Sequence, residues 1–356
     1  MSFIPRNNKK RNVSLILIIS FGKNKTLNVL SRIITKDDFS DVYIKFKERG
    51  FEFLLSKLNI KSLERTKSAF DNTTSNMASN WWIIPKVRER WNLKMTGNPD
   101  VDYKKYYVQK YTNENDSLKL LSLGSGTCSN ELEFASYPQF EEVVCVDISR
   151  SRLDNAAETA KKRNLNNMQF LCEDVYKYPF PEEYFDIILF NSSLHHFNNI
   201  NHFIPTYIDK ALKKNGRIII NEYVGADRLQ FSKEDICAIN KAIKLIDDPY
   251  RVKSRTNIIK KSFSGHGIIR MLMSDPSECI DSSSILPTLH KHYKVVEERP
   301  YGGNILQSAL KDIAHHFIDA EEDDRKMQIL NALFEFEDDY LLTRTSSFVF
   351  GIYEKE

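Results

Sequence analysis

The stretch that decides the fold is Leu118–Glu131, which reads LKLLSLGSGTCSNE. An apolar run over residues 118–123 leads into Gly-Ser-Gly at 124–126, and a helix is predicted to open near Ser129. Glycine at such a junction lets the backbone take a positive φ and approach a ligand closely, while the helix start offers unpaired N–H groups. The stretch therefore predicts a strand, a glycine turn and a helix that can bind a nucleotide-like ligand.

Further apolar runs follow at regular intervals, and each ends in polar residues. The run at 143–146 ends on Asp147, which lies 21 residues after Gly126. Polar residues also follow the runs at 168–172 and 185–190. An acid at that distance, at the tip of the next parallel strand, accepts hydrogen bonds from ribose hydroxyls. Alternatively, Asp147 caps the next helix. Because ligands of open α/β sheets bind beyond the carboxyl ends of the strands, these polar groups are expected to face one crevice.

The motifs LSLGSGTCS, VVCVDIS, CEDV, FDIILFNSSLHHF and KALKKNGRIIINEY resemble those of the class I S-adenosylmethionine-dependent methyltransferases, over about residues 118–223. The resemblance implies that S-adenosyl-L-methionine is the cofactor, with a ribose-binding acid at Asp147 and an adenine-contacting acid at Asp174. The cofactor-binding residues that it implies are Ser122, Gly124, Ser125, Gly126, Asp147, Ile148, Asp174, Val175, Asn191 and Ser192.

The sequence departs from the family pattern at two positions. Ser122 stands where the family usually has an acid, and Cys128 stands where it usually has a glycine. A serine can still offer a hydroxyl, whereas Cys128 puts a side chain where backbone usually meets the ligand. These departures motivate one rival hypothesis, a methyltransferase-like binding or scaffold subunit that has lost catalysis.

Three residues that follow the fourth and fifth strands are candidates for the chemistry: His195, His196 and Glu222. A histidine is the usual general base near neutral pH, and Glu222 is a rival base at the same crevice. The alternative for both histidines is packing or hydrogen bonding. His266, Tyr223 and Tyr301 are further candidates, if the segment after the fifth strand closes over the site.

Composition excludes several classes of protein. The 356 residues include 51 basic and 48 acidic side chains, a near balance that argues against a dedicated nucleic-acid binder. The five cysteines show no CxxC spacing, so buried thiols in a reducing, cytoplasmic compartment are expected. No histidine belongs to an HExxH or Cys/His pattern, so the sequence predicts no structural metal.

The apolar run at 13–19 follows three basic residues, as the apolar region of a secretory signal does. The run is short, however, and it predicts a β-strand without a membrane span.

We expect an α/β fold with a Rossmann-like, seven-stranded, mostly parallel sheet, helices on both faces and an antiparallel last strand. The expected divisions are an N-terminal extension (1–80), a helical cap (81–117), the S-adenosylmethionine-binding core (118–224), a lid or substrate insertion (225–292) and closing strands and helices (293–356). The three tryptophans, all within residues 81–91, either cap the site or attach the N-terminal segment to the sheet.

The function predicted from the resemblance is O-methylation of a small polar acceptor such as a sugar or secondary metabolite. NSSL at 191–194 stands where amide or base N-methyltransferases of this family often have Asn-Pro-Pro-Tyr. A protein or RNA methyltransferase is the alternative within the enzyme class. An NAD-dependent oxidoreductase is disfavoured because the third glycine of the dinucleotide fingerprint is missing.

Overall fold

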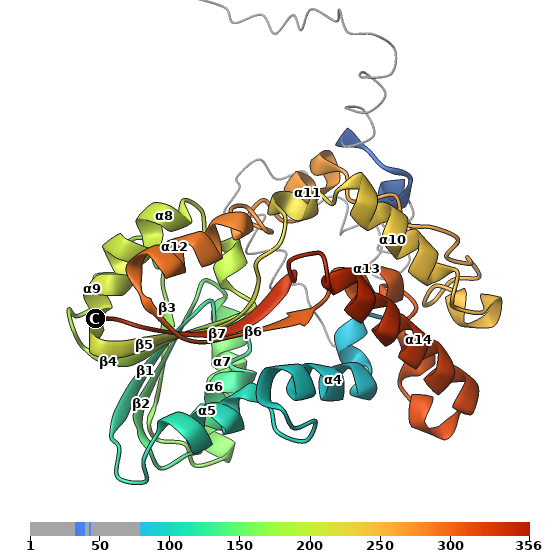
Figure 1. Cartoon of the computed structure of the whole chain (residues 1–356). Helices are drawn as coiled ribbons and strands as arrows, with labels where there is room; N and C mark the ends of the chain where they lie inside the picture. The colour runs from blue at the N-terminus through green and yellow to red at the C-terminus, as the bar shows by residue number, and fades with distance from the viewer. Residues whose placement is uncertain (1–32, 40–42, 44–78) are drawn as a thin grey trace, which may run out of the picture.

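The computed structural model describes residues 33–39, 43 and 79–356, so the strand predicted at 13–19 and most of the predicted N-terminal extension lie outside the described residues. The described chain is built on one sheet of seven strands in the order β3-β2-β1-β4-β5-β7-β6 (Figure 1). The strands are β1 (Leu118–Leu123), β2 (Phe140–Asp147), β3 (Met168–Cys172), β4 (Phe185–Asn191), β5 (Leu212–Tyr223), β6 (Lys294–Gly302) and β7 (Phe348–Glu354).

The pairing of the strands confirms the predicted mostly parallel sheet. Strands β1 to β5 pair in parallel, and β7 lies between β5 and β6 and runs antiparallel to both. Helices connect β1 to β2, β2 to β3 and β4 to β5, as crossovers between parallel strands commonly do, whereas no helix separates β3 from β4. Strands β1 and β3 occupy the residues that their apolar runs predicted, and the run at 143–146 lies inside β2.

Side chains of successive strand residues enter two different cores. In β1, Leu121 and Leu123 pack in the core beneath α8 and α12, whereas Leu120 packs in the core that contains α5, α6 and α7. The α-helices are α4 (Pro85–Thr96), α5 (Tyr103–Tyr111), α6 (Ser129–Phe134), α7 (Arg150–Lys162), α8 (Ile200–Phe203), α9 (Asp209–Ala211), α10 (Lys233–Ile243), α11 (Ile268–Ser274), α12 (Ile285–His292), α13 (Leu306–Leu310) and α14 (Asp324–Leu341). Helices therefore cover both faces of the sheet, as predicted (Figure 1).

A third core lies beside the β6 end of the sheet and is made of helices. Helices α4, α10, α13 and α14 contribute to it, together with short helical turns (Figure 1). The short helical segments within residues 79–356 are the 3₁₀ segments η1 (Trp81–Ile83), η2 (Leu194–His196), η4 (Asp227–Leu229), η5 (Asp248–Arg251), η6 (Ser282–Ser284), η7 (Ala314–Phe317) and η8 (Ala320–Glu322), and the π-helical η3 (Ile204–Ile208). This helical cluster joins residues that are far apart in the sequence into one apolar core.

Two of the three tryptophans, Trp81 and Trp91, belong to the helical cluster. Trp81 is buried, and its ring centroid lies 4.5 Å from that of Trp91 and 5.3 Å from that of Phe348 in β7. Trp82 is 48% exposed. The structure thus favours the second of the two alternatives, in which tryptophans attach the segment before α4 to the sheet.

Candidate functional site

A cavity of about 560 Å³ opens at the carboxyl ends of the first four strands. This volume falls within the range of small-molecule binding pockets. The residues that line it are Gly124, Ser125, Gly126, Thr127, Ser129, Asn130, Val146, Asp147, Ile148, Arg152, Glu173, Asp174, Val175, Tyr176, Asn191, Ser192, Ser193, His196, Phe197, Asn198, Pro276, Ser277 and Ile280. Most of them directly follow a strand, which is where parallel α/β sheets bind their ligands.

The glycine turn after β1 brings main chain to the cavity wall. Gly124 has φ +70°, and a Cβ atom on it would lie 2.8 Å from the Cβ of Ser193, so a larger residue cannot fit. Gly126 has φ +55°, and its N–H donates to Oδ2 of Asp147 at 2.8 Å. The turn is therefore bonded to the end of β2, and it exposes backbone where a ligand would lie.

Asp147 is at the centre of this wall. While Oδ2 accepts from Gly126, Oδ1 accepts from the backbone N–H of Ser149 at 2.8 Å, just before α7. A carboxylate offers about four lone-pair positions, so two remain for a ligand. The alternative role predicted from the sequence, a contact to the start of the next helix, is present, and it leaves capacity for ribose hydroxyls.

The structure brings together nine of the ten residues that the resemblance implied for the cofactor. Each of these nine lines the cavity: Gly124, Ser125, Gly126, Asp147, Ile148, Asp174, Val175, Asn191 and Ser192. Ser122 does not line it, so the geometry gives no support to its predicted contact with the cofactor. Ser122 is 1% exposed and donates from Oγ to Oε1 of Glu131 at 2.6 Å, because its position in β1 points into the core rather than to the strand end.

Cys128 does not obstruct the cavity. It has φ +54° and is fully buried, and its Sγ lies 3.5 Å from Oγ of Ser125. The thiol packs in the core beside α6, behind the turn, and Cys128 itself does not line the cavity. The departure from glycine is thus accommodated on the buried side of the turn.

The remaining wall combines apolar surface with one orphaned hydroxyl. Tyr176 lines the cavity, and its OH both accepts from the N–H of Asn198 and donates to the same residue's carbonyl. Phe197 adds a second aromatic side chain. Oγ of Ser193 is buried and has no hydrogen-bond partner in the structure. Apolar area for a base, carboxylates for hydroxyls and an unsatisfied hydroxyl fit a polar nucleoside such as S-adenosylmethionine.

The three predicted catalytic residues lie together, but they differ in their access to the cavity. Glu222 is fully buried; its Oε1 accepts from the backbone N–H groups of Ser193 and Leu194, and its Oε2 lies 2.7 Å from Nδ1 of His195. Of the three, only His196 lines the cavity. Glu222 is therefore connected to the cavity through His195 and through the backbone of Ser193 and Leu194.

The two imidazoles have opposite electrostatic environments. Burial alone would lower the pKa of His195, but the Glu222 carboxylate outweighs burial and raises that pKa to about 9. Burial, together with the neighbouring His195, lowers the pKa of His196 from its usual value. Near neutral pH, His196 is thus the neutral imidazole of the pair and the one that can accept a proton.

A second group of polar residues reaches the same place from the segment after α11. Oγ of Ser277 lies 3.1 Å from Nδ1 of His196 and donates to Oδ1 of Asp275 at 2.6 Å. The carboxylate of Glu278 lies 3.9 Å from Nε2 of His195 and 3.8 Å from Nε2 of His196. Sequence reasoning missed these three residues, because no motif marks them and at least 79 residues separate them from the histidines.

The other residues considered from the sequence have partners elsewhere. His266 Nδ1 lies 2.6 Å from an Arg270 nitrogen, the OH of Tyr223 donates to the carbonyl of Ala226, and the OH of Tyr301 donates to Oδ1 of Asn221. None of His266, Tyr223 and Tyr301 lines the cavity.

Among the helices that the structure describes, none is long and apolar enough to cross a bilayer.

Comparison with known proteins agrees with this geometry. Residues 121–220, from β1 to β5, match the methyltransferase domain family. An uncharacterized methyltransferase of Bacillus subtilis (strain 168), YcgJ, is 27% identical over 110 residues, which are 31% of this chain and 42% of that protein. A second uncharacterized methyltransferase, C1B3.06c of Schizosaccharomyces pombe, is 35% identical over 88 residues, which are 23% of this chain and 31% of that protein.

Solved structures show distant likeness. The crystal structure of the Bacillus YcgJ protein has a TM-score of 0.36 and 18% identity, covering 67% of this chain and 90% of that one. The [4+2]-cyclase SpnF has a TM-score of 0.41 and 13% identity, covering 85% of this chain and 94% of that one.

The family match, residues 121–220, covers most of the residues that line the cavity. The chain spans less than half the length of the two curated relatives that it matches. The matched residues nevertheless include the glycine turn, Asp147, Asp174 and both histidines that follow β4. The chain therefore contains a domain of the class I S-adenosylmethionine-dependent methyltransferase family.

Proposed function

We propose that the protein is an S-adenosylmethionine-dependent methyltransferase that methylates a small polar acceptor, such as a sugar or secondary metabolite, at oxygen. The observation that carries this proposal is the cavity at the strand ends, which nine of the ten expected cofactor residues line within the matched domain. The positions of these nine residues around one cavity, and not the fold alone, therefore support the assignment to the methyltransferases.

Each side of the cavity is assigned one part of the cofactor. Asp147 would accept from the ribose hydroxyls with its two remaining lone pairs, and Asp174 would contact the adenine between Ile148 and Val175. The backbone of the glycine turn, with Asn191 and Ser192 opposite, would hold the methionine portion. Asn191 is prepared for this role, because its Oδ1 already accepts hydrogen bonds from Tyr103 and Asn221.

The chain has to align the acceptor and remove its proton. S-adenosylmethionine, when bound, supplies a methyl group on a sulfonium that leaves readily. His196 is the member of the catalytic group that reaches the cavity, and we assign it the contact with the acceptor, with His195 and Glu222 fixing its surroundings. A positioned base contributes about 10² to 10⁴-fold to turnover when the acceptor is a hydroxyl.

The acceptor is proposed to enter under the insertion at 225–292. Pro276, Ser277 and Ile280 from this insertion line the cavity, opposite the strand ends. We expect residues 251–284 to gain hydrogen-exchange protection when cofactor and acceptor are both bound, because lids exclude water and position reactants. Equal protection in the free protein would instead make this segment a fixed wall.

Calorimetry with S-adenosylmethionine, S-adenosylhomocysteine and NAD tests the cofactor, and a panel of acceptors tests turnover. We expect both sulfur compounds to bind and NAD not to bind. Binding without turnover on small molecules, peptides or RNA would favour an inactive scaffold subunit. Turnover only on peptides or RNA would favour the macromolecular alternative. Variants of His195, His196 and Glu222 that all retain wild-type turnover would move the acceptor elsewhere.

A further inference from the structure

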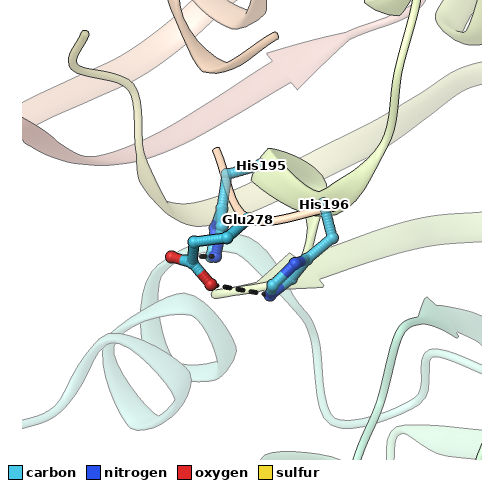
Figure 2. A group of neighbouring side chains, drawn as sticks. All are labelled: His195, His196 and Glu278. Carbon is cyan, nitrogen blue, oxygen red and sulfur yellow. Dashed lines mark ion pairs between the residues drawn. The ribbon is translucent and has the colours of Figure 1, made fainter. Parts of the chain in front are cut away.

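Two histidines and a glutamate from distant parts of the chain converge beside the cofactor cavity. His195 and His196 lie on η2, directly after β4, and Glu278 comes from the segment between α11 and η6. Figure 2 shows the carboxylate of Glu278 facing both imidazole rings. One possible ligand atom from each of the three residues lies within 4.8 Å of the other two.

Outer partners leave the Nε2 atom of each imidazole as its ligand atom. At His195, Nδ1 lies 2.7 Å from Glu222, and a carboxylate can only accept, so Nδ1 carries the hydrogen. At His196, Nδ1 faces Oγ of Ser277, whose only hydrogen goes to Asp275, so this Nδ1 is again the donor. The Nε2 atoms of both rings then lie on the side of Glu278, as in metal sites whose histidines are oriented by carboxylates, and an ion that binds there displaces any proton on Nε2.

The segment that carries Glu278 is bonded in place rather than loosely apposed. The guanidinium of Arg228 donates to the carbonyls of Pro276 and Glu278, and the N–H of Ile280 donates to the carbonyl of His195. Sγ of Cys279 lies 3.3 Å from Oε1 of Glu278. Each of the three converging residues thus has a partner that fixes its orientation.

The distances and the donor atoms identify the class of ion. Zinc takes imidazole nitrogens at about 2.0–2.1 Å and carboxylate oxygens at about 2.0–2.2 Å, and two histidines with one glutamate form a known three-ligand set. The three ligand atoms lie within 4.8 Å of one another, so each has to move by less than about 1 Å to reach such a distance from one shared ion. Magnesium and calcium prefer all-oxygen sites, so the imidazoles favour a transition metal.

We propose that His195, His196 and Glu278 bind one divalent transition-metal ion of the zinc class at the edge of the cavity. Three protein ligands leave a fourth position open, and His196 and Ser277 also line the cavity, so that position borders the cavity. An acceptor oxygen could occupy it, which would orient the acceptor without His196 acting as base. This role for the ion rests on the proposed function, whereas the binding of the ion does not.

The test is a titration of chelator-treated full-length protein with Zn²⁺, followed by calorimetry, and with Co²⁺, followed by visible absorption. Neither cofactor nor acceptor is present. We expect one ion per chain. The Glu222→Gln variant, which alters the outer partner of His195 and none of the three ligands, should weaken binding by about 10–100-fold. Glu278→Gln, which removes a ligand, should weaken it further.

The matched control is Glu298→Gln, because Glu298 also lies 2.7 Å from a histidine nitrogen, that of His290, away from the cluster. It should bind Zn²⁺ as the wild type does. Equal affinities of wild type and Glu278→Gln, or no binding of either ion at micromolar concentrations, would overturn the proposal. Glu278 is partly exposed, so its variant is expected to fold, and its thermal unfolding is measured alongside. In a separate calorimetric titration, a wild-type protein that binds Zn²⁺ but does not bind S-adenosylhomocysteine would count against the proposed function and leave the metal site standing.

Discussion

Glu222 and Glu337 are both fully buried, and each fixes a loop by accepting backbone hydrogen bonds. Glu222, at the end of β5, accepts from Ser193 and Leu194 and lies against an imidazole. Glu337, in α14, accepts from the N–H groups of Gly303, Ile305 and Leu306, and its cation is the buried Arg90 at 3.0 Å. The helical cluster thus pairs its glutamate with a cation that never loses its proton, whereas the cavity pairs its glutamate with a group that can.

The difference separates a structural device from a functional one. A permanent ion pair keeps one arrangement at any pH at which the protein is folded. A histidine against a carboxylate can hold a proton or take part in binding an ion, and it does so next to a cavity. The same geometry of a buried carboxylate with two or three backbone donors therefore serves stability in one region, and under the proposed function it serves chemistry in the other.

The largest expected effect is at Glu337. The Glu337→Gln substitution leaves the buried Arg90 with Asp338 as its remaining carboxylate, and loss of one partner of a buried pair costs about 3–5 kcal/mol. We expect the free energy of unfolding to fall by about 3 kcal/mol or more, measured by denaturant titration. Asp338→Asn, which removes the half-exposed partner of the same guanidinium, should cost about 1 kcal/mol or less. Equal effects of both substitutions would mean that burial of Glu337 does not matter.

Asp147 extends the comparison to a carboxylate with two backbone donors and an open side. Because its remaining lone pairs face the cavity, Asp147→Ala should weaken S-adenosylhomocysteine binding by about 1.5–3 kcal/mol through lost charge-assisted hydrogen bonds. Calorimetry measures the affinity, and Asp154→Ala, on the exposed side of α7, is the control. An unchanged affinity would remove Asp147 from the site.

The strands and strand-end residues could be predicted because they depend on local sequence. Strands buried on both faces appear as continuous apolar runs, and residues such as Asp147 and Asn191 must follow them. Ser122 is the predicted cofactor residue that does not line the cavity, and the reason is physical. The carboxylate that meets it comes from Glu131, in the first turn of α6, and no spacing rule relates the two positions.

Other features depend on contacts between distant segments. Apolar residues recur at helical spacing over residues 203–212, but a π-helical segment that contains Pro205 interrupts the helix there, because proline lacks the N–H that the regular ladder needs. Helix α13 ends at Leu310, since Asp312 takes φ +68° and donates its N–H to the carbonyl of Ser79. Glu278 could not be assigned to the cavity because only the folded insertion brings it to the histidines.

Glu131 is a buried glutamate with no cation in hydrogen-bonding contact, and it should show the opposite pH dependence from a paired carboxylate. Burial raises its pKa from 4.5 to about 6, only partly offset by the hydroxyl of Ser122. Between pH 4.5 and 6 the native state holds more protons than the unfolded state, so stability falls as the pH rises. Above pH 6, the charged and buried carboxylate therefore lowers the free energy of unfolding by about 2 kcal/mol.

The Glu131→Gln substitution should remove that cost. We expect the variant to be more stable than the wild type by up to about 2 kcal/mol at pH 8 and about equally stable at pH 4, measured by denaturant titration at both values. Glu133→Gln, at a partly exposed position of the same helix, is the control, and it should change stability by less than about 1 kcal/mol. A Glu131→Gln protein that is less stable at pH 8 would show that the charged carboxylate is needed there.

The smallest effect on stability is expected at Glu222, and it tests the comparison most directly. In Glu222→Gln, the amide oxygen can still accept from the N–H groups of Ser193 and Leu194, and His195 can take a neutral tautomer that accepts from the amide NH₂. Unlike Arg90, the imidazole need not remain as an unpaired buried charge. We therefore expect a loss of only about 1 kcal/mol in the free energy of unfolding, set beside the Glu337→Gln protein in the same titration. Turnover should respond in the opposite order, with Glu222→Gln impaired and Glu337→Gln nearly unaffected at temperatures where it is folded. If Glu222→Gln destabilises the protein as much as Glu337→Gln does, the His195 pair is a structural ion pair like that of Arg90, and the functional contrast between the two regions fails.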